Sequence, residues 1–333
     1  MSLAGRSVLV TGGAGFIGSN LVDALIGGGT KVRVLDDLST GRREHVNGDA
    51  ELIVADIRDA EAARRAVEGI DLVLHLACSN LRLSLLDPWP SHDINGGGTL
   101  RMLEASVAAG VGKFVYCSSS EVYGTARTAP MTEDHPTEPT TVYGASKLAG
   151  EWYALSFVET HDLDVWVIRR FNTYGPREHH EGTSAEVIPK MVLRALNGQA
   201  PVIFGDGSQT RDFTYVTDTV DGIVAAASHD GLTGQAVNIA AGREVSIADI
   251  AQLVVKACGT DVEPVFAPPR PADVMRHYGD ITKAREQFGW EPTVAIEDGL
   301  VRYVEWLQAN HGAEVGALLA SDAERNWERS GAR

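Results

Sequence analysis

A glycine-rich turn near the N-terminus limits the folds open to this chain more than any other feature. The turn, residues 11–18, reads Thr-Gly-Gly-Ala-Gly-Phe-Ile-Gly and lies between a predicted strand, Ser7–Val10, and a segment with helical spacing, Ile17–Ile26. In this setting the glycines permit a tight turn, a close backbone approach to a pyrophosphate and close packing of helix on strand. The amides at the helix start then face the phosphates. The sequence therefore predicts a dinucleotide site that includes Gly12, Gly15, Phe16, Ile17 and Gly18.

Two carboxylates stand where the second predicted strand, Lys31–Leu35, ends. Asp36 and Asp37 follow the glycine turn by about twenty residues, where an acidic side chain accepts hydrogen bonds from the adenosine ribose. A carboxylate there repels a 2′-phosphate and favours NAD over NADP, a preference that Arg42 and Arg43 weaken slightly. Two more strands are predicted at Glu51–Val54 and Leu72–His75. The residues that follow them are candidates for lining the cofactor cleft: Asp56, Ile57, Leu76 and Ala77. A packing role is an equally good interpretation of each of these residues.

Strands and helices alternate through the first two-thirds of the chain. Lys113–Cys117 and Val165–Arg169 also have the composition of strands, and helical spacing covers residues 60–67, 98–109 and 143–159. Such alternation predicts a parallel sheet with helices on both faces. After Phe171 the sequence breaks into Gly- and Pro-rich pieces, which predict a loop-rich lobe. We expect an α/β fold: a Rossmann-type doubly wound parallel sheet with a smaller C-terminal substrate-binding lobe.

The expected domains follow from this division. An NAD-binding domain would span residues 1–171, with a return segment near 213–242. The substrate-binding lobe would comprise 172–212 and 243–320, and 321–333 would form a tail. The loops 80–91 and 177–186 would shape the substrate pocket.

Charge and composition narrow the possible partners. With 29 basic and 45 acidic residues the net charge is −16, which argues against a nucleic-acid partner because phosphate backbones bind to clustered positive charge. The chain has no long apolar run and no basic leader before its first strand, so we expect no membrane partner and a cytoplasmic location. The three cysteines, Cys78, Cys117 and Cys258, are too widely spaced for a zinc motif and are expected to be buried and reduced. His179 and His180 are expected to be solvent-exposed, and no metal is expected.

A tyrosine and a lysine one helical turn apart are the candidate catalytic pair. Tyr143 and Lys147 would share one face of a helix. A lysine ammonium favours the phenolate and lowers the tyrosine pKa, as a general base for a sugar hydroxyl requires. A hydroxyl from the run Ser118–Ser120 would orient the same oxygen. The pair alone is commonly structural, but its place after the glycine turn, the acidic strand end and the serine run favours catalysis.

This order of motifs resembles the short-chain dehydrogenase/reductase superfamily. The segments 169–177, 187–189, 205–213 and 270–273 are similar to those of its extended nucleotide-sugar epimerase/dehydratase branch, and the resemblance covers roughly residues 6–310. It implies NAD as cofactor, Tyr143 as catalytic base, Lys147 as its partner and nicotinamide-ribose ligand, and Ser119 as the hydroxyl that binds the sugar O4. It further implies that Asn172, Arg211 and Arg270 hold the diphosphate, that Asp273 contacts the nucleotide ribose, and that Pro189, Val202 and Phe204 flank the base.

The residues after Ser119 bear on the reaction. Members of this branch first oxidise C4 to give a 4-keto sugar, and a 4,6-dehydratase then uses an Asp-Glu pair. Here the pair is Ser120-Glu121, which disfavours 4,6-dehydration. A glutamate at position 121 resembles UDP-glucuronate decarboxylases, which have Thr-Ser-Glu at this place. Those enzymes usually carry a proline-rich segment after the fourth strand, where this chain has residues 80–86 instead. Arg82 in this segment could contact an anionic sugar.

We therefore expect an NAD-dependent nucleotide-sugar 4-epimerase acting on a UDP- or dTDP-hexose or hexuronate. UDP-glucuronate decarboxylase and nucleotide-sugar 4,6- or 5,6-dehydratase remain alternatives, and a non-catalytic NAD-binding protein of the same fold is a further one. The helices predicted at 98–109 and 143–159 resemble those that pair in homodimers of this family, and a homodimer is expected.

Overall fold

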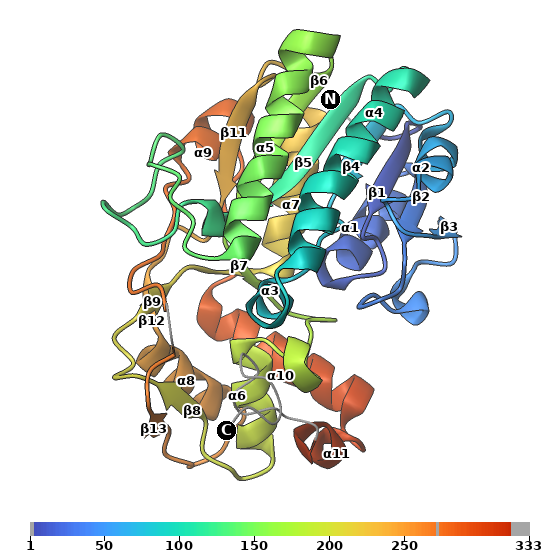
Figure 1. Ribbon diagram of the computed structural model, residues 1–333. Coiled ribbons are helices and arrows are strands. Elements are labelled where there is room, and N and C mark those ends of the chain that lie inside the picture. Colours follow the sequence, from blue (N-terminus) through green and yellow to red (C-terminus); the bar gives the residue numbers. More distant parts are fainter. Residues whose placement is uncertain (1–2, 271–272, 321–333) are drawn as a thin grey trace.

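The central element of the computed structural model, which describes residues 3–270 and 273–320, is a parallel sheet (Figure 1). Its strand order is β11-β6-β5-β4-β1-β2-β3, and every neighbouring pair is parallel. The chain runs outward from β1 to β3 and then crosses to β4, so the order reverses between β1 and β4. The predicted doubly wound sheet is confirmed. The strands are β1 (Ser7–Thr11), β2 (Lys31–Asp36), β3 (Glu51–Val54), β4 (Leu72–His75), β5 (Lys113–Ser119), β6 (Asp164–Arg170) and β11 (Gln235–Ile239).

Helices cover both faces of this sheet because successive strand residues point to opposite sides. Leu9, Val73 and Phe114 pack under one group of helices, whereas Val8, Val10 and Leu74 pack under the other. The first group includes α4 and α5, which lie in front of the sheet in Figure 1. It consists of α2 (Ala60–Val67), α4 (Thr99–Ala109) and α5 (Val142–His161), and the second of α1 (Phe16–Gly27), α7 (Val216–Ser228) and α9 (Thr282–Phe288).

A second lobe lies beyond the carboxyl ends of the strands and has its own core (Figure 1). The short parallel pair β7 (Asn172–Tyr174) and β10 (Phe213–Tyr215) leads into it. Ile281 and Trp290, by contrast, pack into the core of the sheet. The remaining elements are α6 (Val187–Leu196), β8 (Val202–Phe204), β9 (Thr210–Arg211), β12 (Val245–Ser246), α8 (Ile247–Ala257), β13 (Val265–Ala267), α10 (Ile296–His311) and α11 (Val315–Ala320). The expected tail 321–333 lies outside the described residues.

The segment 80–91, expected as a loop, is largely helical. It contains α3 (Leu81–Leu86) and leads into a π-helix, Ser91–Gly98. The Asn80 side chain accepts a hydrogen bond from the Leu83 amide and so caps α3 at its start. No described helix is both long and apolar enough to cross a membrane.

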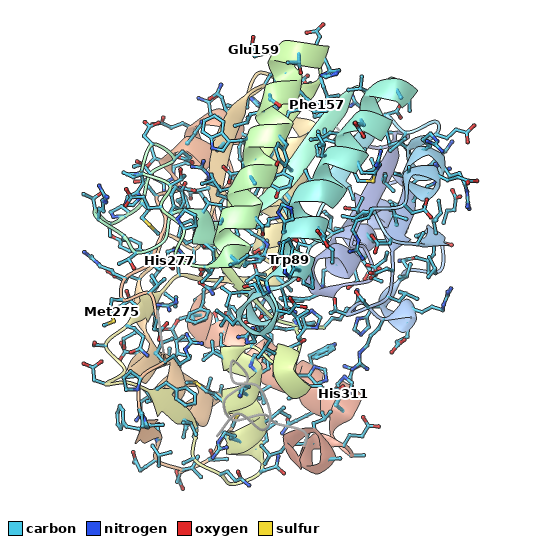
Figure 2. The ribbon with its side chains drawn as sticks, viewed as in Figure 1. Trp89, Phe157, Glu159, Met275, His277 and His311 are labelled. Carbon is cyan, nitrogen blue, oxygen red and sulfur yellow. The ribbon has the colours of Figure 1, made fainter. Side chains whose placement is uncertain are left out.

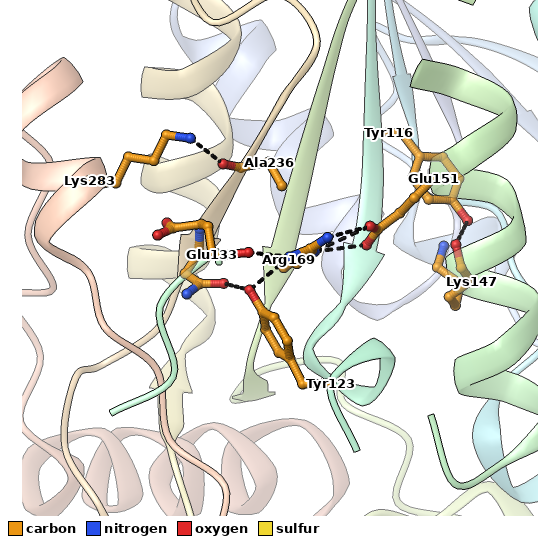
Figure 3. Close-up of polar contacts among 9 residues, drawn as sticks. Tyr116, Tyr123, Glu133, Lys147, Glu151, Arg169, Ala236 and Lys283 are labelled. Carbon is orange, nitrogen blue, oxygen red and sulfur yellow. Dashed lines mark hydrogen bonds and ion pairs between the residues drawn. The ribbon is translucent and has the colours of Figure 1, made fainter. Parts of the chain in front are cut away.

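A buried polar network fixes α5 to the sheet (Figure 3). Arg169 of β6 donates to both carboxylate oxygens of Glu151 on α5, with Nη2 2.8 Å from Oε2. Arg169 also donates to the Tyr123 hydroxyl, which in turn donates to Asn238 at 2.7 Å. Since α5 also carries Tyr143 and Lys147, this network holds the candidate catalytic pair in register with the strand ends.

Candidate active site

A cavity of about 610 Å³ runs along the carboxyl ends of the strands and is bounded on its other side by the second lobe. In doubly wound sheets ligands bind at this edge, next to the point where the strand order reverses. Three predicted site residues are not in its lining: Ser120, Lys147 and Pro189. The others line it: Gly12, Gly15, Phe16, Ile17, Gly18, Asp36, Asp37, Asp56, Ile57, Leu76, Ala77, Arg82, Ser119, Glu121, Tyr143, Asn172, Val202, Phe204, Arg211, Arg270 and Asp273.

The glycine turn has the shape of a phosphate cradle. Gly12 has a φ of 71°, and a Cβ there would lie 2.8 Å from the Ala77 amide nitrogen. A Cβ on Gly18 would collide with the Gly12 carbonyl oxygen. Helix α1 starts at Phe16 with no side chain capping its first amides, so these amides are available to an anion. The turn therefore fits a dinucleotide pyrophosphate.

The end of β2 is acidic, and neither Asp36 nor Asp37 forms an ion pair with a residue that the structure describes. Asp36 accepts hydrogen bonds from the Ala14 and Leu38 amides, both at 2.9 Å. Burial raises the pKa of this carboxyl, and the two amides oppose the shift. Arg42 pairs instead with Glu181 at 2.9 Å. This arrangement suits the unphosphorylated ribose of NAD.

The adenine side of the cavity is formed after β3 and β4. Asp56 pairs with Arg58, with 2.5 Å between Oδ2 and Nη2, and this hydrogen bonding lowers the Asp56 pKa. Ala77 is held by a hydrogen bond from its amide to the Thr11 hydroxyl. His75 lies outside the cavity lining, between Thr11 and Thr99, where burial lowers its pKa to about 3. His75 is therefore a packing residue, whereas the residues that follow it face the cavity.

Tyr143 lies at the start of α5, beside the end of β5. Thr141 caps this helix by accepting a hydrogen bond from the Gly144 amide at 3.0 Å. A Cβ on Gly144 would lie only 2.6 Å from the Glu121 carbonyl oxygen, so glycine allows the helix start to approach the turn after β5 closely. Burial raises the Tyr143 pKa, as does the nearby Cys78, whereas Arg170 and the Ser119 hydroxyl act to lower it.

Lys147 is placed differently from the sequence-based expectation. Its ammonium donates to the Cys117 carbonyl oxygen at 2.7 Å and lies 4.4 Å from the centre of the Tyr116 ring. Burial lowers its pKa. Among the main influences on the Tyr143 pKa the cation is Arg170, the last residue of β6, which acts to lower it. Lys147 contacts the strand that carries Ser119 rather than the cavity.

The structure separates Ser120 from Glu121. Ser120 is buried at the start of a 3-10 turn, Ser120–Val122, and its carbonyl oxygen is 3.1 Å from His277 Nε2. Glu121 lines the cavity, where burial raises its pKa while Arg211 and Arg270 act to lower it. The position where a dehydratase carries its aspartate is thus not part of the cavity lining.

The second lobe supplies a positive cluster to the cavity. Arg211 Nη2 and Arg270 Nη2 both bind Asp273 Oδ1, at 2.7 and 2.8 Å. Two guanidinium groups share one carboxylate, which leaves a net positive charge that an anion can neutralise. The side-chain oxygen of Asn172 is buried and has no hydrogen-bond partner among the described residues. Pro189 is buried within α6, and Val187 lines the cavity in its place.

Several lining residues were not anticipated. Cys78 is only partly buried and lines the cavity, so the expectation of three buried cysteines is wrong for this residue. Cys258 is also only partly buried. His179 lines the cavity as well. His180 is buried, with its ring centre 4.8 Å from that of His311, so the expected exposure is wrong there too. Within the described residues, no group of three or more His, Cys, Asp or Glu side chains is arranged to hold a metal ion.

Arg170 is the most consequential of the missed residues. Its position at the carboxyl end of a parallel strand, in register with Ser119 of β5, is the signal that could have identified it. Glu186, which pairs with Arg82 at 2.6 Å, lies in the segment predicted to shape the pocket but was not singled out.

Comparisons with known proteins agree with this geometry. Residues 8–240 match the NAD dependent epimerase/dehydratase family. The UDP-glucose 4-epimerase of Mycolicibacterium smegmatis is 41% identical over 308 residues, covering 90% of this chain and 98% of that one. The crystal structure of UDP-glucose 4-epimerase with UDP-glucose from Thermotoga maritima has a TM-score of 0.88 and 36% identity, covering 91% and 99% of the two chains. DesIV, a dTDP-glucose 4,6-dehydratase from Streptomyces venezuelae with NAD bound, has a TM-score of 0.87 and 32% identity, covering 92% and 98%.

The fold and the site together define a dinucleotide-binding protein of the extended short-chain dehydrogenase/reductase type. The chain belongs to the NAD-dependent epimerase/dehydratase family, and its cofactor is NAD.

Proposed function

We propose that the protein is a nucleotide-sugar 4-epimerase that acts through a transient 4-keto sugar on a UDP- or dTDP-hexose or hexuronate. One observation carries the proposal: Tyr143 and Ser119 line the same continuous cavity as the glycine turn and the cluster of Arg211, Arg270 and Asp273. A cofactor on the turn and a nucleotide diphosphate on the arginines would meet beside Tyr143. The similarity to UDP-glucose 4-epimerases supports this proposal.

In this proposal Tyr143 takes the proton of the sugar C4 hydroxyl, and Ser119 holds the same oxygen by a hydrogen bond. NAD, when bound, supplies the acceptor for the C4 hydride and its donor on return. Lys147 supports the end of β5 through its hydrogen bond to the Cys117 carbonyl oxygen. Arg211, Arg270 and Asn172 hold the diphosphate, which lets the keto sugar turn its other face to the cofactor without leaving the site. Tyr143 then returns the proton to O4.

The placement of Ser120 favours epimerisation over elimination of water. A 4,6-dehydratase needs an acid and a base together in the cavity, and only Glu121 of this pair lines it. Glu121 is the residue that would serve a lyase if the proposal were wrong.

Incubation of the purified protein with UDP-glucose, UDP-glucuronate and dTDP-glucose, without added NAD, tests the function. NMR and mass analysis of the product should show unchanged mass and inverted C4 with at least one of them. Loss of water or carbon dioxide from the product would replace the epimerase by a dehydratase or a decarboxylase.

We also propose that the protein is a cytoplasmic homodimer that pairs through α4 and α5. Large apolar side chains are exposed on these helices: Leu100 on α4, and Tyr153 and Trp152 on α5, the last 63% exposed. Trp89, labelled in Figure 2, is 69% exposed in the segment just before the π-helix, which packs against α5. Exposed aromatic residues of this kind are typical of interfaces.

Trp152→Glu is expected to convert the dimer into a monomer, because a carboxylate would be buried without a partner in a two-fold contact. Light scattering after size-exclusion chromatography measures the change. Phe266→Glu, at an exposed aromatic residue on β13 of the second lobe, is the matched control and should leave the mass unchanged. A Trp152→Glu protein of unchanged dimeric mass would exclude this interface.

A further inference from the structure

Beside Tyr143 the cavity contains a second group of two arginines and one carboxylate, Arg82, Arg170 and Glu186. Arg82 Nη1 lies 2.6 Å from Glu186 Oε1. Arg170 also lines the cavity, and its guanidinium makes no hydrogen bond or ion pair with any residue that the structure describes. Burial acts to lower the Arg170 pKa, but Tyr143, Cys78, Cys117 and Glu186 outweigh it and raise the pKa. At this end of the cavity Glu186 pairs with Arg82, and the charge of Arg170 is left without a paired carboxylate among the described residues.

This cluster has the same composition, two arginines and one carboxylate, as the cluster proposed to hold the diphosphate. There, Arg211 and Arg270 share Asp273, and the remaining positive charge suits an anionic group. A nucleotide sugar whose sugar is uncharged carries one anionic group, its diphosphate. A second cluster of the same composition indicates a second anionic group on the substrate.

The position of Arg170 indicates where that group lies. Arg170 and Ser119 are in-register neighbours on adjacent parallel strands, which are about 4.8 Å apart. Ser119 and Tyr143 are the residues proposed to hold O4 of the sugar. The ring carbon next to C4 is C5, whose substituent carbon is C6. A charged group on C6 would therefore lie within reach of the Arg170 guanidinium.

We propose that Arg170 is a specificity-determining residue that binds a carboxylate at C6, so that the substrate is a nucleoside diphosphate hexuronate. The inference rests on the proposed function and narrows its substrate. A carboxylate offers two acceptor oxygens to the forked donors of a guanidinium, whereas the C6 hydroxyl of a neutral hexose leaves the cation without a counter-charge. Arg82 and Glu186 flank Arg170 and keep its end of the cavity polar.

The same contact has a consequence for the 4-keto stage. A 4-keto hexuronate is a β-keto acid, which decarboxylates when the C5–C6 bond breaks, its electron pair passes to the enolate and neutral carbon dioxide leaves. An ion pair with Arg170 stabilises the charged carboxylate relative to neutral carbon dioxide. It therefore favours return of the sugar with its carbon skeleton intact.

The turnover test compares UDP-glucuronate with UDP-glucose on the NAD-loaded protein. We expect kcat/KM to be about 100-fold higher for UDP-glucuronate, because a site built for a charged partner discriminates strongly against an analogue that lacks it. Arg170→Met should abolish most of this ratio, and Arg170→Lys, which keeps the charge but not the fork, should give an intermediate ratio. Arg194→Met is the matched control: Arg194 also lines the cavity but donates to the Ala200 carbonyl oxygen, and its loss should leave the ratio unchanged.

Calorimetry repeats the comparison in the absence of turnover. It measures the binding of UDP-glucuronate and of UDP-glucose to the NAD-loaded Tyr143→Phe protein, with and without the additional change Arg170→Met. Equal binding of the two nucleotides, or an equal loss for both in Arg170→Met, overturns the inference even if UDP-glucose is epimerised. Release of carbon dioxide from UDP-glucuronate, with a preference that still depends on Arg170, supports the inference and overturns the epimerase. The two failures are therefore distinguishable.

Discussion

Tyr143→Phe is expected to lower kcat by about 100- to 10,000-fold, the range that a positioned acid–base group contributes. The substitution removes the hydroxyl that takes the C4 proton but keeps the ring that packs at the start of α5. NAD should remain bound, because the glycine turn and Asp36 are untouched. NMR measures turnover, and the amount of nucleotide released from the denatured protein measures how much NAD was bound.

A tyrosine in the second lobe provides the matched control for this loss. Tyr303 on α10 is buried, and its hydroxyl makes no hydrogen bond with any described residue. Tyr303→Phe should therefore keep full turnover and should not lower stability, since it removes an unsatisfied polar group. Full turnover in Tyr143→Phe would contradict the catalytic assignment and leave the non-catalytic NAD-binding protein as the better hypothesis.

The sheet was predictable from the sequence because each strand is a short apolar run bounded by turn residues. All six strands predicted in the first two-thirds of the chain are present, and the structure extends four of them by one or two residues. The cofactor turn was predictable for a related reason: Gly12 and Gly18 stand where a side chain would collide with neighbouring backbone, so the local sequence itself records the constraint.

The sugar end of the cavity was much less predictable. Arg170 belongs to a strand, and whether a strand residue faces the cavity or the core depends on register with its neighbours, which the local pattern does not contain. Ser120 follows Ser119 directly, yet it begins a 3-10 turn and is not part of the cavity lining. The direction of the Lys147 ammonium likewise depends on a carbonyl group of β5, thirty positions away in the chain.

Glu151→Ala is expected to lower the free energy of unfolding by about 3–5 kcal/mol, the effect of removing one partner of a buried ion pair. The side chains of Arg169 and Glu151 are 9% and 2% exposed. Without Glu151, the Arg169 cation stays in the core, and its acceptors among the described residues are the Tyr123 hydroxyl and the Glu133 carbonyl oxygen (Figure 3). Urea denaturation followed by circular dichroism measures the loss. Because the pair ties α5 to β6, turnover should fall as well.

An exposed pair of the same chemistry separates burial from charge. Arg127 and Glu138 form an ion pair with side chains 62% and 55% exposed, and Glu138→Ala should lower the free energy of unfolding by less than about 1 kcal/mol. The double variant Glu151→Leu, Arg169→Met removes both buried charges and should recover much of the stability lost in Glu151→Ala, because no isolated charge remains. Losses of equal size in Glu151→Ala and Glu138→Ala would show that the buried pair does not hold α5. The position of Tyr143 would then have to come from the helix cap at Thr141 and the close contact of Gly144 with Glu121.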